Sequence, residues 1–267
     1  MILEKKNFNI MFSINDRKSF ELNVIFFVLV ILFINQCLFY NLHRNLKAFL
    51  NIVPTPPNEK AIKAMTFGDD EFYFRLNSFK VQNMGDTFGR MTPLKDYDYK
   101  KLYHWFVYLD KFDTKSNYLA SIAAYYYSAT QNVKDIIYVI KFLEKHADNN
   151  LKENWWWLYQ ATYLSKFMYG DDKLALRLAR KLRLTSPKDA PLWTKRMEGI
   201  FLFNSDEDCE SLRIMNEVLN QYENTATEND EQKTKELNYM KFFIEKNIEK
   251  LKNKNIDYTK CFKKKER

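Results

Sequence analysis

The chain has 267 residues, a net charge of +8 and a hydrophobic content of 46%. The excess positive charge lies at the two ends, because residues 1–51 carry +3 and residues 229–267 carry +5, which leaves residues 52–228 without net charge. A neutral body lacks the basic surface that releases counterions from a nucleic acid, so we expect no nucleic-acid partner. The basic residues at the C-terminus are expected to form a solvated tail, with a partner-binding or lipid-binding tail as the alternative.

The first predicted element is an apolar helix from Leu22 to Tyr40. No Asp, Glu, Lys or Arg occurs between Glu21 and Arg44, and a helix that crosses a bilayer needs about 20 mostly apolar residues. We therefore predict a transmembrane helix over residues 22–43. A cleaved signal peptide is the alternative, but the residues that follow Ile34 offer no small-x-small cleavage site, and the Gln before Cys37 does not fit a lipoprotein signal.

The distribution of basic residues gives little indication of membrane orientation, because Lys and Arg are about equally frequent on the two sides of the predicted span. A single N-terminal anchor usually leaves its N-terminus in the cytoplasm. We therefore expect residues 1–21 to be cytoplasmic and the C-terminal domain to be periplasmic, in a single-pass protein of the bacterial inner membrane.

Residues 44–67 are predicted to be a juxtamembrane linker, because Pro54-Thr-Pro-Pro57 cannot continue a helix. Residues 68–253 show helical periodicity with few interruptions, and a basic tail follows at residues 254–267. The fold class is therefore all-α. Helices are expected near residues 69–83, 96–112, 116–130, 132–147, 152–169, 171–184, 189–203, 206–222 and 230–252.

Small residues recur in this helical region at a nearly constant interval. Ala124, Ala161 and Gly199 are 37 and 38 residues apart, each on the first helix of a predicted pair, where a small side chain permits close helix contact. A period of this length is typical of α-solenoids built from helical hairpins.

The central unit resembles a tetratricopeptide repeat. Trp157 and Ala161 match the large and small residues of that repeat's first helix, and the second helix and its end are matched by Ala175, Ala179, Leu182 and Pro187. The interval from Ala161 to Ala175 is two residues longer than the consensus, and the flanking units are more degenerate. The resemblance implies a TPR-like solenoid that binds another protein.

Two blocks, Phe88–Tyr99 and Trp155–Ala161, also resemble those of uncharacterised bacterial membrane-anchored repeat proteins. Within the helices, the triplets Tyr125-Tyr126-Tyr127 and Trp155-Trp156-Trp157 each spread over about 200° of a helix surface. We interpret them as core residues packed between neighbouring helices, with an aromatic ligand platform as the alternative.

The segment from Phe67 to Tyr99 is the least repeat-like and holds three of the five glycines. Glycine permits turns with positive φ, and Asp86 and Asp96 are expected to cap turns or helices. A hard cation held by Asp86, Asp96 and Asp98 is the alternative, although their spacing is not that of a calcium loop. If the protein has a selective site, we expect it here, with these candidate partner-binding residues: Arg90, Asp96, Tyr97, Asp98 and Tyr99.

No pattern in the chain indicates catalysis. Cys37, Cys209 and Cys261 share no short spacing, and we expect free thiols, although the last two could pair on the oxidising side of a membrane. The three histidines, His43, His104 and His146, are scattered and are expected at the surface or at helix ends. Neither a metal nor a cofactor is expected. The predicted function is a membrane-anchored, non-catalytic scaffold or adaptor; a structural subunit of an envelope complex is the alternative, and a small-ligand-binding protein or enzyme is less favoured.

Overall fold

The structure is a computed structural model that describes residues 23–41, 52–58, 61, 68–87, 90–187, 190–223 and 231–262. At residues 87, 90, 232 and 233 it describes the backbone alone. The chain divides into two compact units, Met1–Asn51 and Ile52–Arg267. Each is described by itself.

The first unit contains the helix Asn23–Asn41, which coincides with the predicted apolar element. This helix has 19 residues and a mean hydropathy of 2.2, and no part of its most apolar window is buried. Such a helix is long and apolar enough to cross a membrane. A signal sequence near an N-terminus has the same length and composition.

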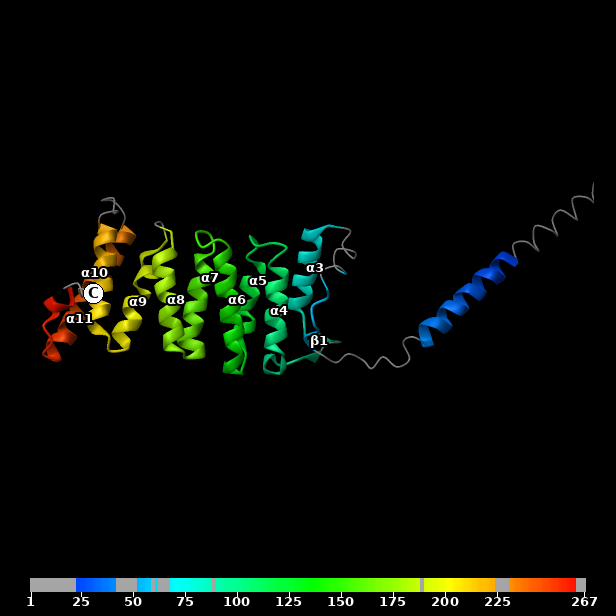
Figure 1. The fold of residues 1–267 in the computed structure, drawn as a ribbon, viewed down its shortest axis with the longest axis horizontal. Helices are drawn as coiled ribbons and strands as arrows, with labels where there is room; N and C mark the ends of the chain where they lie inside the picture. The colour runs from blue at the N-terminus through cyan, green and yellow to red at the C-terminus, as the bar shows by residue number, and fades with distance from the viewer. Residues whose placement is uncertain are drawn as a thin grey trace, which may run out of the picture. The chain divides into compact units, whose positions relative to one another are not determined.

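The second unit is helical apart from one short strand pairing, as the sequence predicts, and its successive helices stand side by side in a row (Figure 1). The α-helices are α3 (Asp70–Gln82), α4 (Tyr99–Leu109), α5 (Tyr118–Tyr125), α6 (Ile136–Asn149), α7 (Trp155–Tyr163), α8 (Asp172–Thr185), α9 (Leu192–Asn204), α10 (Asp208–Glu223) and α11 (Glu231–Asn253). Most helices pack mainly against their neighbours along the chain, whereas α4 packs mainly on α6.

Shorter helical segments explain why several helices differ from the predicted ranges. Helix α5 ends early and is followed by the 3₁₀ turn η2 (Tyr127–Ala129), and α7 continues as the π-helical segment η4 (Leu164–Tyr169) up to Gly170. Helix α4 begins three residues later than expected, after the 3₁₀ turn η1 (Leu94–Asp96). The remaining short segments are η3 (Val133–Asp135) and η5 (Tyr258–Phe262).

Aspartates define the N-termini of three helices. The side chains of Asp69, Asp98 and Asp171 accept hydrogen bonds of 2.9, 3.0 and 2.9 Å from backbone N–H groups in the first turns of α3, α4 and α8. Each bond satisfies one of the donors that a helix start leaves unpaired. The cap of α4 is therefore Asp98, whereas Asp96 lies in the preceding turn.

A continuous core runs through most of the row, and aromatic rings fill much of it. Phe106 of α4 stacks on Phe142 of α6 with ring centroids 4.8 Å apart, and Tyr127 is completely buried beside Phe106. The small residues expected at helix contacts are buried too. At Gly199, an added Cβ would lie 2.8 Å from Cγ of Met215 on α10, so α9 and α10 approach closely at this point.

The folded unit extends beyond both predicted boundaries. Before residue 68, Val53 is buried, and the indole N–H of Trp105 donates a hydrogen bond of 2.7 Å to the carbonyl of Pro54. Part of the predicted linker therefore packs on α4. After residue 253, η5 contacts α10, so residues expected in a solvated tail belong to the fold.

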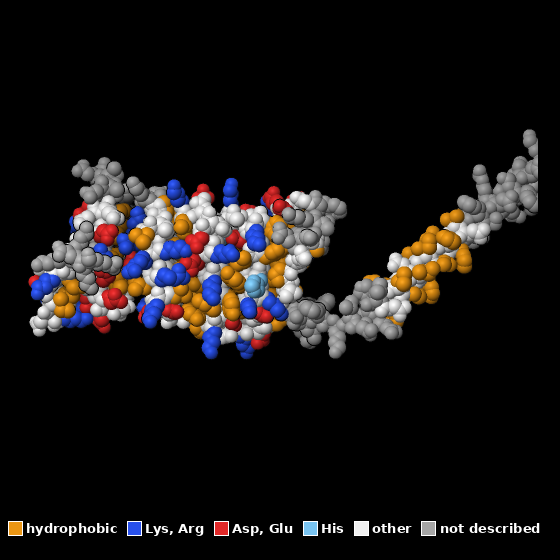
Figure 2. All heavy atoms as spheres, in the orientation of Figure 1, with side chains coloured by type: hydrophobic (Ala, Val, Ile, Leu, Met, Phe, Trp, Pro, Cys, Tyr) orange, Lys and Arg blue, Asp and Glu red, His pale blue; other side chains and the backbone are white. Residues whose placement is uncertain are grey.

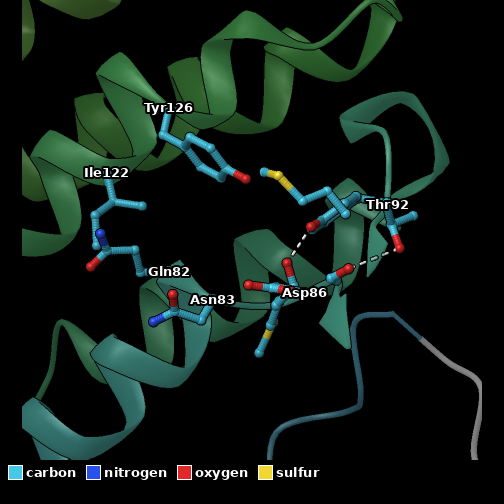
Figure 3. Close-up of a pocket in the computed structure, with 10 residues that line it drawn as sticks. Gln82, Asn83, Asp86, Thr92, Ile122 and Tyr126 are labelled. Carbon is cyan, nitrogen blue, oxygen red and sulfur yellow. Dashed lines mark hydrogen bonds between the residues drawn. The ribbon is translucent and has the colours of Figure 1, made fainter. Parts of the chain in front are cut away.

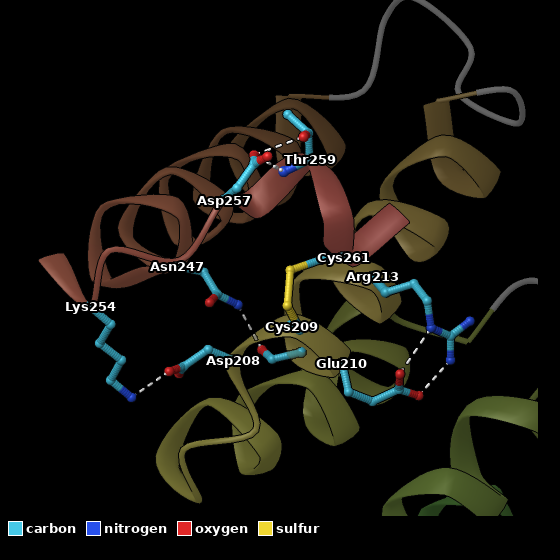
Figure 4. The surroundings of a disulfide bond; sticks show 10 residues. Asp208, Cys209, Glu210, Arg213, Asn247, Lys254, Asp257, Thr259 and Cys261 are labelled. Atoms are coloured by element: carbon cyan, nitrogen blue, oxygen red, sulfur yellow. Dashed lines mark hydrogen bonds and ion pairs between the residues drawn. A yellow bond between two sulfur atoms is a disulfide. The ribbon is translucent and has the colours of Figure 1, made fainter. Parts of the chain in front are cut away.

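A disulfide between Cys209 of α10 and Cys261 of η5 fixes this C-terminal segment (Figure 4). The expectation of two free thiols is thereby corrected: the pair is separated by 52 residues in sequence, and α11 brings the chain back to α10. Beside the disulfide, the buried carboxylate of Asp208 forms ion pairs with Lys250 at 2.8 Å and with Lys254 at 2.6 Å.

One histidine lies in the last turn of its helix, as expected, but is buried in the core. His146 is completely buried in α6, where its Nδ1 lies 2.6 Å from Oδ1 of Asp110 at the end of α4. Asn149 donates to the other oxygen of Asp110 at 2.8 Å. His104 is exposed, as expected, and His43 lies outside the described residues.

Charged residues of both signs lie together on one face of the second unit, over α6 and α8 (Figure 2). Arg177 and Lys181 of α8 contact Glu144 of α6 at 2.6 and 3.0 Å, and Lys181 also contacts Asp148 at 2.7 Å. Farther along, Arg180 and Arg183 hold the buried Glu198 of α9 at 2.7 Å each. These pairs link α8 to α6 on one side and to α9 on the other.

Candidate functional site

The predicted site residues separate into different environments. Tyr99 is buried, and its hydroxyl donates to the carbonyl of Tyr127 at 2.7 Å, so it is a core residue. Asp98 caps α4 and pairs with Lys101 at 3.4 Å, whereas Asp96 is exposed at the end of η1. Of the four whose side chains the structure describes, only Tyr97 lines the pocket described next. The side chain of Arg90 lies outside the described residues, although its backbone belongs to β2.

This pocket lies where the end of α3, a strand pairing and α5 meet, and it has a volume of about 250 Å³ (Figure 3). The strands β1 (Asp86–Thr87) and β2 (Arg90–Met91) are antiparallel. Polar groups of Asn83, Asp86 and Thr92 line one side, and Ile122 of α5 and Tyr126, which follows α5, line the other. The pocket is thus partly polar and open to solvent.

Gly85 and Tyr97 determine the shape of this pocket. Gly85 has a φ of +83°, which an L side chain rarely adopts, and an added Cβ would lie 2.0 Å from the Tyr97 hydroxyl oxygen. That hydroxyl donates to the carbonyl of Met84. Burial raises the pKa of Tyr97 to about 12, with the neighbouring Tyr126 contributing in the same direction, so Tyr97 remains a neutral donor at physiological pH.

The hard-cation alternative has no support in the geometry. Among the described residues, no group of three or more His, Cys, Asp or Glu side chains is arranged to hold a metal ion. Asp98 is occupied as a helix cap, so its carboxylate is directed to backbone N–H groups of α4.

A second feature lies across α5, α7 and α9. We call it the aromatic surface and define it by Tyr125, Trp156, Tyr159, Tyr163 and Trp193. Helix α7 places three of these rings on one side, because positions 156, 159 and 163 are three and four residues apart.

Contacts between the rings join the three helices. The indole N–H of Trp156 donates a hydrogen bond of 2.8 Å to the hydroxyl of Tyr125, which links α7 to α5. Tyr159 and Trp156 lie 4.6 and 6.2 Å from the ring of Trp193, which links α7 to α9. The rings therefore form one contiguous surface.

The five side chains of the aromatic surface carry no formal charge, and three of them are exposed to solvent. Tyr125 is 57% exposed, Tyr163 42% and Trp156 36%. Helices α5 and α7 contain no Asp, Glu, Lys or Arg. Burial, together with the neighbouring Tyr163 and Tyr125, raises the pKa of Tyr159, so its hydroxyl stays protonated. The surface thus offers neutral rings with hydrogen-bonding edges.

The two aromatic triplets supply much of this surface, which corrects their interpretation as core residues. Tyr127 and Trp157 are indeed buried, but Tyr125 and Trp156 point outward. The signal was present in the sequence, because a triplet that spreads over about 200° must leave a ring outside any single buried stripe. Which ring is outside depends on where the neighbouring helices pack.

Comparisons with protein-family profiles, with characterised proteins and with solved structures gave no match to this chain.

Proposed function

We propose that this chain is a single-pass membrane protein whose helical unit is a non-catalytic scaffold or adaptor that binds another protein through the aromatic surface. The observation that carries the proposal is the contiguous array of Trp and Tyr rings on the alternate helices α5, α7 and α9, three of which are exposed: Tyr125, Trp156 and Tyr163. Large exposed apolar areas on a soluble unit commonly mark interaction sites, and Trp and Tyr dominate the binding energy of protein interfaces.

The helical arrangement in this proposal is a TPR-like solenoid. It is supported by the order of the helices, by the burial of Ala124 and Ala161 on alternate helices, and by the close approach of Gly199 to α10. In a solenoid each repeat contacts only its neighbours, which leaves an extended face for a partner. The aromatic surface of α5, α7 and α9 would lie on that face.

The proposed topology places the N-terminus in the cytoplasm and the helical unit in the periplasm of a bacterial cell. The helix Asn23–Asn41 would be the membrane anchor. The disulfide Cys209–Cys261 supports an extracytoplasmic location for the second unit, because such bonds persist in oxidising compartments and are rare in the cytosol.

An obligate structural subunit of an envelope complex is the second candidate. A permanent partner would cover a flat apolar patch, whereas the exposed rings here carry hydroxyl and indole N–H groups at their edges. These polar edges favour a partner that binds and dissociates. The pocket beside Tyr97 is the feature that supports a third, less favoured candidate, a small-ligand-binding protein.

Affinity purification from gently solubilised membranes tests the proposal. The full chain should recover a stoichiometric partner, and a Tyr125→Ala/Trp156→Ala variant should lose it. The matched control is Phe242→Ala, which removes a ring that is 55% exposed on α11, away from the aromatic surface. Circular dichroism must show that all three proteins are folded. Recovery of the bait alone would contradict the scaffold, and retention of the partner by the double variant would contradict the surface.

A further inference from the structure

Helix α3 is apolar on two opposite sides. Its buried side, which includes Tyr73 and Val81, packs on the rest of the unit, with contacts to α4 and α5. On the other side, Phe72, Leu76 and Phe79 are 55%, 41% and 61% exposed. These positions are four and three residues apart, so the three side chains form one line along the helix. We call them the α3 stripe.

The place of α3 in the fold makes this exposure notable. Helix α3 stands at one end of the row of helices that the structure describes, so no described helix of the row covers the stripe (Figure 1). A helix that ends a solenoid usually presents a polar outer face, because no further repeat buries it. Adjacent apolar side chains left in water are typical of an interaction surface. The stripe is therefore expected to be covered by a partner.

The charges on α3 are arranged to complement a second copy of the same helix. Asp69, Asp70 and Glu71 lie at its N-terminal end, and Lys80 lies at its C-terminal end. Between them, Arg75 is already paired with Glu71. In an antiparallel pair of α3 helices, the acidic end of each helix lies beside the basic end of the other. Such a pair has complementary charges at both ends.

Two-fold symmetry also brings the individual side chains into register. Asp69 and Lys80 are 11 residues apart, about three turns, so they lie on the same flank of the stripe. In an antiparallel pair related by a two-fold axis, each flank meets the same flank of the other copy. With the axis near Leu76, Asp69 of each copy faces Lys80 of the other, and Phe72 faces Phe79.

We propose that the α3 stripe is a self-association surface, on which two copies of this chain pair through antiparallel α3 helices. A parallel pair is disfavoured because it sets Lys80 beside Lys80 and the two acidic ends beside each other. Three apolar side chains from each copy make a small contact, so the pair is expected to be weak and reversible. The stripe shares no residue with the aromatic surface, and this inference does not rest on the proposed function.

Oxidative cross-linking of single cysteines tests the pairing. The full chain, in a Cys37→Ser background, is kept in the membrane fraction of the expressing cells and treated with copper phenanthroline and dioxygen, which oxidise two facing thiols to a disulfide. Leu76→Cys lies near the two-fold axis and should give a cross-linked dimer. The control is Leu184→Cys, 66% exposed on α8, which should remain monomeric.

The outer positions of the stripe report the direction of the helices. In the antiparallel pair, Phe72 and Phe79 are each displaced from their own copies by roughly 9–12 Å along the helix, beyond the ~7 Å between Cα atoms that a disulfide spans. Phe72→Cys alone and Phe79→Cys alone should therefore give little dimer. The two variants expressed together with tags of different length should cross-link to each other.

Lys80 tests the charge argument. Lys80→Glu places a carboxylate opposite Asp69, so it should reduce the Leu76→Cys cross-link by up to about fivefold, whereas Lys80→Arg should retain it. Phe79→Asp removes apolar contact from both halves of the pair and should abolish the cross-link. The substituted side chains are exposed, and circular dichroism checks that each variant is folded.

Three outcomes would overturn the proposal. Leu76→Cys dimers no more abundant than those of Leu184→Cys would exclude self-association through the stripe. Equal homodimers of Phe72→Cys and Leu76→Cys would exclude the antiparallel pair, and a cross-link to a different protein would show that another partner covers the stripe. Tyr125→Ala/Trp156→Ala should not change the Leu76→Cys cross-link, so failure of the proposed function and failure of this inference are distinguishable.

Discussion

Nδ1 of His146 lies 2.6 Å from a carboxylate oxygen of Asp110, and both side chains are buried between α4 and α6. Asn149 holds the second oxygen of Asp110, and Asn154, before α7, donates to the carbonyl of His146 at 3.2 Å. One polar cluster therefore connects the end of α4, α6 and the start of α7 inside an otherwise apolar core. Neither residue lines the pocket or the aromatic surface, so the cluster is structural.

Removal of one partner should be costly because it leaves the other buried and unpaired. Asp110→Ala is expected to lower the free energy of unfolding by about 3 kcal/mol, measured by denaturant titration of the full chain in detergent micelles. Glu71→Ala is the control, since the Glu71–Arg75 pair is exposed and should contribute less than about 1 kcal/mol. Equal effects of the two substitutions would contradict a structural role for the buried cluster.

Alanine substitutions at Gly85 and Gly170 separate two costs to stability, that of backbone strain and that of overpacking. Both have positive φ, but a Cβ at Gly85 would overlap Tyr97, whereas a Cβ at Gly170 meets nothing within 4 Å. Gly170→Ala should cost about 1 kcal/mol from backbone strain. Gly85→Ala should cost a further ~1–3 kcal/mol from overpacking. Thermal unfolding of both variants checks this, and similar costs would show that Tyr97 moves freely.

The disulfide should stabilise the C-terminal end of the row. A loop closed over 52 residues is expected to contribute about 3–4 kcal/mol through the unfolded state, so Cys209→Ser should lower stability by that amount. Dithiothreitol should reproduce the loss in the wild-type chain and have no effect on the variant.

The same bond provides a test of topology. In intact bacterial cells, a membrane-impermeant maleimide should label Cys209 and Cys261 only after reduction. Cys37 lies in the apolar helix, so a Cys37→Ser background removes its contribution. Labelling without reduction, or labelling only after the cells are lysed, would contradict a periplasmic disulfide.

The ion pairs between α6 and α8 predict a dependence on acidic pH. Hydrogen bonding to Arg177, aided by Lys181, lowers the pKa of Glu144 from 4.5 to about 2. A carboxyl whose folded pKa is depressed stabilises the fold above its unfolded pKa, and this contribution is lost as the pH falls from about 4.5 towards 2. Glu144→Gln should therefore cost about 1 kcal/mol at pH 7, after allowance for solvent screening, and almost nothing near pH 2.

The control for this titration is Glu153→Gln, which changes an exposed carboxylate before α7 that has no ion-pair partner in the described part of the chain. Its effect should be small at every pH. Unfolding curves at several pH values compare the two variants, and a constant difference between Glu144→Gln and wild type would refute the assigned pKa shift.

The hydrogen bond from Trp105 to Pro54 should hold residues 52–58, at the start of the second unit, against α4. Trp105→Phe keeps the ring and removes the donor, so stability should fall by only about 1 kcal/mol. Limited proteolysis should detect a larger local effect, with faster cleavage near residues 52–58. Unchanged cleavage would mean that burial of Val53 holds this segment without the hydrogen bond.

The sequence by itself determined the elements of this protein. The apolar helix follows from a charge-free run, and the helices of the second unit follow from apolar residues at spacings of three and four. These are local properties, because periodicity and length decide whether a segment can bury one face. The lack of charge in α5 and α7 was equally readable from the chain.

Tertiary structure alone decided which residues meet. His146 lies in the last turn of α6, as the sequence predicts, but only the packing of α4 brings Asp110 beside it. Cys209 pairs with Cys261 because α11 returns the chain to α10. Likewise, each aromatic triplet covers too wide an arc for one stripe, and only the positions of the neighbouring helices bury Trp157 while leaving Trp156 in solvent. Burial and pairing depend on contacts between segments distant in sequence, which no local pattern specifies.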